Sequence, residues 1–297
     1  MLRTSTIYTI VALLVFMPFM ARAQQDMPPL PATPIPGEAA VGILAEFDID
    51  ELPSPHTEIW FIRMELDATG SVAMGKQAGP AVIYVESGDL MLDATGTEDR
   101  GANAATPSTA SGTLLATGSS TLIEPGTDIG FRNEGNVPSS FLMLLMFAGE
   151  DEGQYQESLP EPVGLRQGGL AVGTAEFAPF PAHITIERVV LNQDETITPE
   201  FRERDQEFPG YQGMELGAIE TGSADLILDF ASPANLTWPG MLRGEITGPV
   251  MVPLSTSLKI GTGDAYAFYG STLTWTAADG EPLTILRVII LPEVPGR

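Results

Sequence analysis

The chain has 297 residues, which is enough for two domains of ordinary size, each with its own core. Its 39 acidic residues outnumber 14 basic ones, so the formal net charge of −25 argues against nucleic-acid partners and against binding to anionic membrane surfaces. The absence of cysteine excludes disulfides, thiolate metal sites and a cysteine nucleophile, and the only histidines are His56 and His183.

The first 23 residues have the pattern of an export signal. Arg3 precedes an apolar run over residues 7–20, and Ala21-Arg22-Ala23 fits the small-residue cleavage pattern. We predict cleavage after Ala23 and a secreted or otherwise extracytoplasmic mature protein, with no membrane contact after cleavage; an uncleaved anchor is the alternative. Residues 24–37 contain five prolines, which predicts an extended spacer.

From residue 38 onward, the sequence has the pattern of an all-β protein. Apolar runs are short and rich in β-branched and aromatic residues, and glycine, proline, asparagine and aspartate separate them. The runs at 59–66, 82–86, 89–92 and 141–147 are predicted strands. Residues 95–118 are dominated by glycine, alanine, serine and threonine, which predicts a long loop.

The second half of the chain repeats the first. Residues 40–47 resemble 171–177, Val85-Glu86-Ser87-Gly88 resembles Ile219-Glu220-Thr221-Gly222, and strand 141–147 resembles 283–291. Arg63 in one half corresponds to Arg188 in the other. A period of this length indicates two copies of one domain rather than a solenoid. We therefore predict domains at 38–149 and 168–297, joined by a linker at 150–167.

The glycine spacing resembles that of the cupin superfamily. Gly118, Gly126 and Asn133 fall at the spacing of the second cupin motif, and Gly88 and Gly222 end the first motif in each half. The resemblance implies an exported bicupin, built from two tandem double-stranded β-helix barrels of the cupin-like jelly-roll type. In cupins, three histidines and one glutamate hold a divalent metal in the barrel mouth.

The residues at those ligand positions depart from the family pattern. In the first half the glutamate position is Ala81, the last histidine position is Ile129, and the histidine pair falls on Gly75 and Gln77, or on Met74 and Lys76. In the second half Glu215 keeps the glutamate. Thr274 stands at the last histidine position of that half, and its histidine pair falls on Pro209 and Tyr211, or on Phe208 and Gly210. The metal motifs are thus degenerate, and the prediction is no metal, no cofactor and no catalytic residue.

The sequence leaves two functions open. We predict a non-catalytic module that binds a small molecule or glycan or has a structural role, with Gln77, Tyr211, Glu215 and Thr274 as the polar groups nearest the mouths. The alternative is a metal-dependent isomerase, lyase or oxygenase that uses Glu215 and non-standard ligands. A Ca²⁺ site among the acidic residues of 200–215 and a homodimer through the barrel edges are further possibilities.

Overall fold

The protein is described by a computed structural model of its chain. The described residues are 39–53, 56–95, 112–148, 162–175, 181–197, 213–229, 239–240, 250–251, 257–269, 272–278 and 280–293. The predicted signal segment 1–23, the spacer 24–37 and residues 150–161 of the linker lie outside these ranges. Within them, no helix is long and apolar enough to cross a membrane.

The first half of the chain folds into a two-layered barrel. Its longest strand, β2 (Thr57–Lys76), bends between the layers, so that its first part pairs with β8 and its last part pairs with β7. One layer has the order β2-β8-β3-β6 and the other has the order β2-β7-β4-β5. The remaining bounds are β3 (Ala81–Ser87), β4 (Leu90–Thr95), β5 (Thr113–Leu115), β6 (Ser120–Ile123), β7 (Asp128–Arg132) and β8 (Ser139–Ala148). Strand β5 lies inside the predicted loop 95–118.

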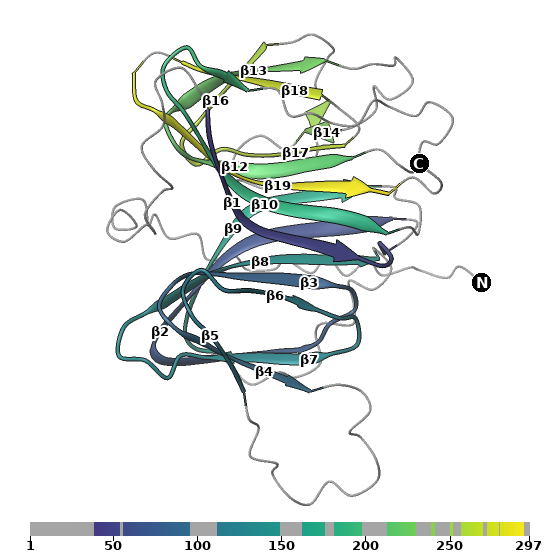
Figure 1. The fold of residues 1–297 in the computed structure, drawn as a ribbon, viewed down its shortest axis with the longest axis vertical. Helices are drawn as coiled ribbons and strands as arrows, with labels where there is room; N and C mark the ends of the chain where they lie inside the picture. The colour runs from purple at the N-terminus through teal and green to yellow at the C-terminus, as the bar shows by residue number, and fades with distance from the viewer. Residues whose placement is uncertain are drawn as a thin grey trace, which may run out of the picture.

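The second half repeats this strand order. Its layers are β10-β19-β12-β17 and β11-β18-β13-β16, and β14 pairs with β15 in a separate short hairpin. The bounds are β10 (Ala182–Leu191), β11 (Thr196–Ile197), β12 (Met214–Thr221), β13 (Ser223–Asp229), β14 (Pro239–Gly240), β15 (Val250–Met251), β16 (Ser257–Gly261), β17 (Ala265–Tyr269), β18 (Thr272–Ala277) and β19 (Leu283–Pro292). The predicted fold class, two tandem jelly-roll barrels in an all-β chain, is confirmed (Figure 1).

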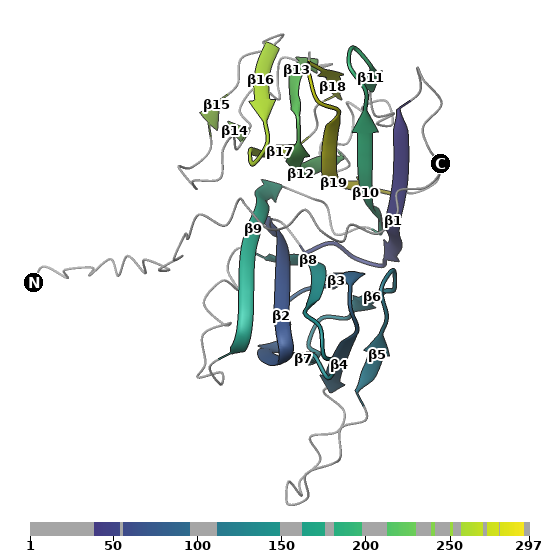
Figure 2. The same ribbon diagram turned by 90° about the vertical axis from the view of Figure 1, so that its left-hand side faces the viewer.

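The opening strand of each half belongs to the sheet of the other half. β1 (Ala40–Ile49) pairs antiparallel with β10 of the second barrel, and β9 (Val163–Ala175) pairs antiparallel with β2 of the first barrel. Figure 2 shows β1 beside β10 and β9 beside β2. The domains predicted at 38–149 and 168–297 follow chain order, whereas the sheets cross that division by this exchange.

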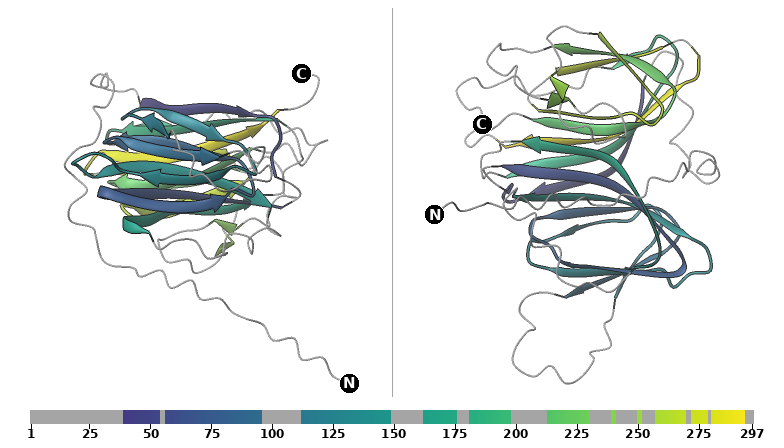
Figure 3. Two further views of the ribbon diagram at one scale, coloured as in Figure 1. Left: turned by 90° about the horizontal axis from the view of Figure 1, so that it is seen from below. Right: turned by 180° about the vertical axis from the view of Figure 1, so that it is seen from behind.

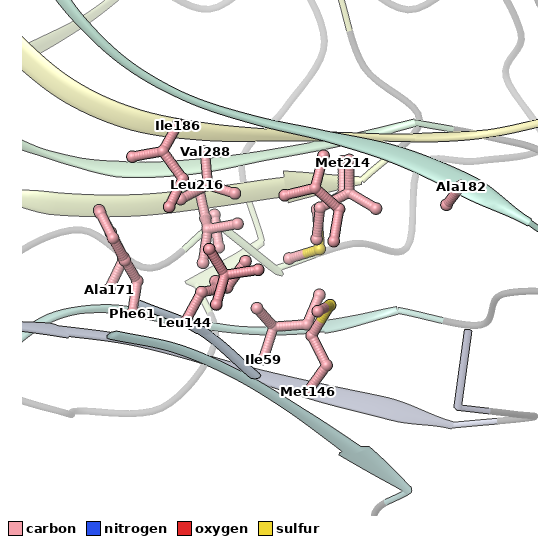
Figure 4. Packing of buried hydrophobic residues seen from close by; sticks show 14 of the residues in the cluster. Ile59, Phe61, Leu144, Met146, Ala171, Ala182, Ile186, Met214, Leu216 and Val288 are labelled. Atoms are coloured by element: carbon pink, nitrogen blue, oxygen red, sulfur yellow. The ribbon is translucent and has the colours of Figure 1, made fainter. Parts of the chain in front are cut away.

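Three hydrophobic clusters stabilise the molecule: one inside each barrel and one between the barrels. The cluster between them combines Ile59, Phe61 and Leu144 of one half with Ile186 and Val288 of the other (Figure 4). The right-hand view of Figure 3 shows the two barrels stacked one above the other. In each barrel, one of the two layers faces the other barrel. Side chains alternate along the strands of that layer, so every second residue points into its own barrel and the residues between them point into the shared cluster.

Four charged residues lie between the barrels at one end of the shared cluster, and we call them the inter-barrel ion-pair cluster. Arg63 Nε is 2.6 Å from Glu86 Oε2, and Arg63 Nη2 is 2.6 Å from Glu220 Oε1. Arg188 makes the reciprocal contacts, at 2.8 Å to Glu86 Oε1 and 2.7 Å to Glu220 Oε2. Arg63 corresponds to Arg188 in the repeat, and Glu86 corresponds to Glu220. Each arginine contacts both glutamates, so the four side chains form a ring in which positive and negative charges alternate.

Candidate functional site

The interior of the N-terminal barrel is apolar. Its buried cluster contains two of the four positions at which the family pattern would place metal ligands, Ala81 and Ile129. Gln77 is also buried in this half, just after β2, and its Nε2 donates to the carbonyl of Gly75 at 3.1 Å. Gln77 Oε1 is buried without a hydrogen-bond partner among the described residues, whereas the cluster around Ala81 and Ile129 is lined by aliphatic and aromatic side chains.

The C-terminal barrel contains a buried polar group of residues, which we call the interior polar cluster. Its members are Glu187, Glu215, Tyr266, Trp275 and Arg287, from strands β10, β12, β17, β18 and β19. Arg287 Nε donates to Glu187 Oε1 at 2.5 Å, and Arg287 Nη1 lies 3.4 Å from Glu215 Oε1. The hydroxyl of Tyr266 donates to the same Glu215 oxygen at 2.8 Å. Figure 1 shows these five strands in the upper barrel.

Two polar atoms of this cluster have unused hydrogen-bonding capacity. Glu215 Oε2 and Trp275 Nε1 are buried and have no hydrogen-bond partner among the described residues. Leaving a buried polar atom unpaired costs about 1–3 kcal/mol. An acceptor or donor supplied from outside the protein would therefore be stabilised here.

Burial is the main influence on the acidity of this carboxyl. It raises the pKa of Glu215, and the negative charge of Glu187 adds to the rise. The positive charge of Arg287 and the hydrogen bond from the Tyr266 hydroxyl lower the pKa again, but the net direction is upward. Burial also raises the pKa of Tyr266, so its hydroxyl keeps its proton and donates.

The two barrels differ at the same positions. Matching Arg63 to Arg188, the strand registers place Ile62 where the second barrel has Glu187, and Met143 where it has Arg287. By the registers of β12 and β18, Ala81 corresponds to Glu215 and Phe131 corresponds to Trp275. At these four positions one barrel has apolar side chains, while the other has two glutamates, an arginine and a tryptophan beside its own apolar cluster.

Known proteins resemble the chain in structure but not in sequence. No protein-family model matches the sequence, and no curated protein matches it. Among solved structures, the coconut allergen cocosin has a TM-score of 0.43 at 9% identity, covering 83% of this chain and 85% of that one. A cupin 2 conserved barrel domain protein from Leptotrichia buccalis has a TM-score of 0.33 at 10% identity, covering 84% and 89%. AerE from Microcystis aeruginosa has a TM-score of 0.40 at 12% identity, covering 82% and 98%.

The strand order decides the fold. Both halves have the same two four-stranded layers in the same order, and each half supplies one further strand to the other. The chain has the fold of a bicupin. The sequence resemblance to cupins is therefore confirmed at the level of the fold.

The predicted site residues do not meet in one place. Gln77 lies in the N-terminal half and Glu215 inside the C-terminal barrel, while Tyr211 lies outside the described residues. Thr274 precedes the buried Trp275 on β18, so its side chain points to the opposite, outer face of that layer, where it is half-buried opposite Ile227. The sequence alignment pairs Ile129 of the first half with Thr274 of the second, but the strand registers pair it with residue 273. Because side chains alternate along a strand, this error of one residue moves the predicted side chain from the inner to the outer face of β18.

Sequence reasoning identified only Glu215 among the five members of the interior polar cluster. The cupin motifs contain no position for Glu187, Arg287 or Tyr266. The motif places its last histidine at Thr274, whose side chain lies on the opposite face of β18 from that of Trp275. A usable signal was nevertheless present, because Glu187 and Arg287 each interrupt a strand that is otherwise mostly apolar. A charged residue that points inward from such a strand needs a buried partner.

The interior polar cluster does not fit the divalent metal that the fold family implies. Glu187 and Glu215 are the only carboxylates of the cluster, and the guanidinium of Arg287 contacts both. That fixed positive charge would repel a divalent cation at the same oxygens. His183, which could supply nitrogen, lies at the exposed start of β10 and contacts Asp48 at 2.7 Å. The described residues form no group of three or more metal-binding side chains, and most of the acidic segment 200–215 lies outside them.

Proposed function

We propose that this bicupin is a non-catalytic binding protein whose C-terminal barrel holds a small, uncharged polar molecule. The observation that carries the proposal is a pair of buried atoms in this barrel, Glu215 Oε2 and Trp275 Nε1, that have no partner among the residues the structure describes. A molecule that hydrogen-bonds to both atoms would remove two desolvation penalties at once.

The two barrels have different roles in this proposal. The N-terminal barrel serves as a structural partner, since its residues at the positions equivalent to Glu187, Glu215, Trp275 and Arg287 are the apolar Ile62, Ala81, Phe131 and Met143. The C-terminal barrel provides binding, and its aromatic side chains shield the polar atoms. The rings of Tyr266 and Trp275 lie 4.7 Å apart, and those of Tyr266 and Phe268 lie 6.0 Å apart.

The proposal places the protein outside the cytoplasm. Its support is the composition of residues 1–23 and the absence of cysteine, which makes the chain indifferent to an oxidising compartment. N-terminal sequencing of the protein recovered from the producing cells tests this part. Gln24 as the first residue is the expected result, and Met1 in an exported form would contradict cleavage.

Binding is tested directly on the indole N–H group of Trp275. The chain has three tryptophans, so ¹⁵N-labelled tryptophan gives three indole signals, and Trp275→Phe assigns one of them. We expect this signal to shift on titration with glycerol, glucose or N-methylacetamide. Trp60 is the internal control, because its Nε1 already donates to Glu58 Oε1 at 2.5 Å and should not respond. If none of the three probes moves the Trp275 signal up to its solubility limit, the binding proposal is wrong.

A further inference from the structure

The hydrogen bonds to Glu215 show which of its oxygens can carry a proton. Oε1 accepts from the Tyr266 hydroxyl and faces Arg287 Nη1, so both donors are directed at this oxygen. A proton on Oε1 would compete with them. Oε2 has no donor among the described residues, and it is the oxygen on which a proton would be accommodated.

The charges of the cluster favour that proton. Two carboxyl groups, Glu187 and Glu215, share one guanidinium, and Arg287 makes its two shortest contacts with Glu187. With both carboxyls ionised, the buried cluster would have an uncompensated negative charge, which is costly away from water. Protonation of Glu215 makes the cluster electrically neutral. The charged or titratable groups around it are Glu187 on β10, Tyr266 on β17 and Arg287 on β19.

We infer that Glu215 acts as a neutral hydrogen-bond donor through Oε2, and that together with Trp275 Nε1 it binds an uncharged carbonyl oxygen of the ligand, as in an amide or a ketone. This inference rests on the binding function proposed above and names the ligand group. A carbonyl oxygen has two lone pairs, so it accepts from both donors. A carboxylate would bring a new charge into a site that is already neutral, and its desolvation would oppose binding.

The glutamate therefore has a different role from the metal-binding glutamate of the fold family. In this chain the fixed cation is Arg287, and it is neutralised by Glu187. The carboxyl of Glu215 is left to donate rather than to coordinate. A protonated carboxyl beside a second donor is a recognised way to bind a carbonyl oxygen in a site shielded from water.

Two substitutions at one position distinguish a donor from an acceptor. Glu215→Gln keeps the shape and can direct its amide NH₂ toward the ligand, with its carbonyl toward Tyr266. We expect N-methylacetamide to bind this variant within about threefold of the wild-type affinity. Glu215→Leu removes the donor, and Trp275→Phe removes the other one, so each should weaken binding about tenfold, the equivalent of one hydrogen bond. Titration calorimetry measures all four proteins, and acetate should bind more weakly than N-methylacetamide.

A second measurement needs no ligand. Infrared difference spectra of the wild type and Glu215→Gln at pH 7 should show the carbonyl band of one protonated carboxyl, present only in the wild type. The inference is overturned if that band is absent, if acetate binds better than N-methylacetamide, or if Glu215→Gln abolishes binding that the wild type shows. Those outcomes leave the binding function intact, whereas the function itself fails if no probe binds the wild type.

Discussion

At the scale of single residues, Gly217 on β12 leaves the space that the Tyr266 hydroxyl occupies. A Cβ atom at this position would lie 2.4 Å from the carbonyl oxygen of Leu286 and 2.9 Å from the Tyr266 hydroxyl. The corresponding residue of the N-terminal barrel is Ile83, whose side chain contributes to an apolar interior. Gly217 therefore supports Glu215 indirectly, because its lack of a side chain leaves room for the Tyr266 hydroxyl that donates to Glu215.

We predict that Gly217→Ala destabilises the protein by about 1–3 kcal/mol, because the added methyl group must displace backbone or the tyrosine hydroxyl. Urea unfolding measures the change. The control is Gly261→Ala in the same barrel, where the nearest atom to an added Cβ is 3.6 Å away. This control should change the free energy of unfolding by less than about 0.5 kcal/mol. Equal effects at the two positions would contradict the proposed crowding.

At the scale of strands, period-two alternation made the elements predictable but not their alignment. The likeness between residues 40–47 and 171–177 matches Ala45 to Ala175. In the structure Ala45 lies opposite Ile186 of β10. The β2 residue that corresponds to Ile186 is Phe61, and it lies opposite Ala171. The structural counterpart of Ala45 is therefore Ala171 and not Ala175. The shift of four residues keeps every side chain on its original face, so hydrophobic pattern alone cannot detect it. A shift of one residue, as at Thr274, does reverse the face.

The inter-barrel ion-pair cluster joins four strands, and the pKa of Glu220 shows how its charges compare with the effect of burial. Burial alone would raise the pKa of Glu220, but the hydrogen bonds and charges of Arg188 and Arg63 outweigh it and lower the pKa. Glu220 therefore stabilises the fold above its ordinary pKa, and this contribution is lost as the pH falls below about 4.3. Glu220→Gln should accordingly reduce the loss of stability on acidification, measured by urea unfolding between neutral and acidic pH.

Arg188→Met is the sharper test of that cluster. The substitution leaves Glu86 and Glu220 close together, mostly buried and with only Arg63 between them, so we expect a loss of about 3–5 kcal/mol. Arg166→Met is the matched control, because Arg166 pairs with Glu65 and Asp67 at the exposed surface and should contribute less than about 1 kcal/mol. Equal losses in the two variants would show that burial between the barrels adds nothing.

At the scale of the whole molecule, duplication was predictable from the sequence and strand exchange was not. Repeated motifs reveal that two similar units exist, but they do not reveal which unit a shared strand joins. β1 could extend the edge at β2 of its own half or the edge at β10 of the other, because both edges have the same repeat-related pattern. The structure places it at β10, and the reciprocal position at β2 is taken by β9. Each barrel is therefore completed by the other half of the chain.

The exchange can be tested covalently because the chain has no cysteine of its own. Asp48 on β1 lies directly opposite His183 on β10, and opposed residues of antiparallel strands have the Cα separation that a disulfide requires. We predict that Asp48→Cys with His183→Cys forms an intramolecular disulfide, seen as a loss of free thiols in the monomer on mild oxidation. Asp48→Cys with Glu58→Cys is the control, since Glu58 is the β2 residue equivalent to His183 and would face β1 only without exchange. Cross-linking of the control pair in place of the first would mean that β1 completes its own barrel and that the two halves exchange no strand at this edge.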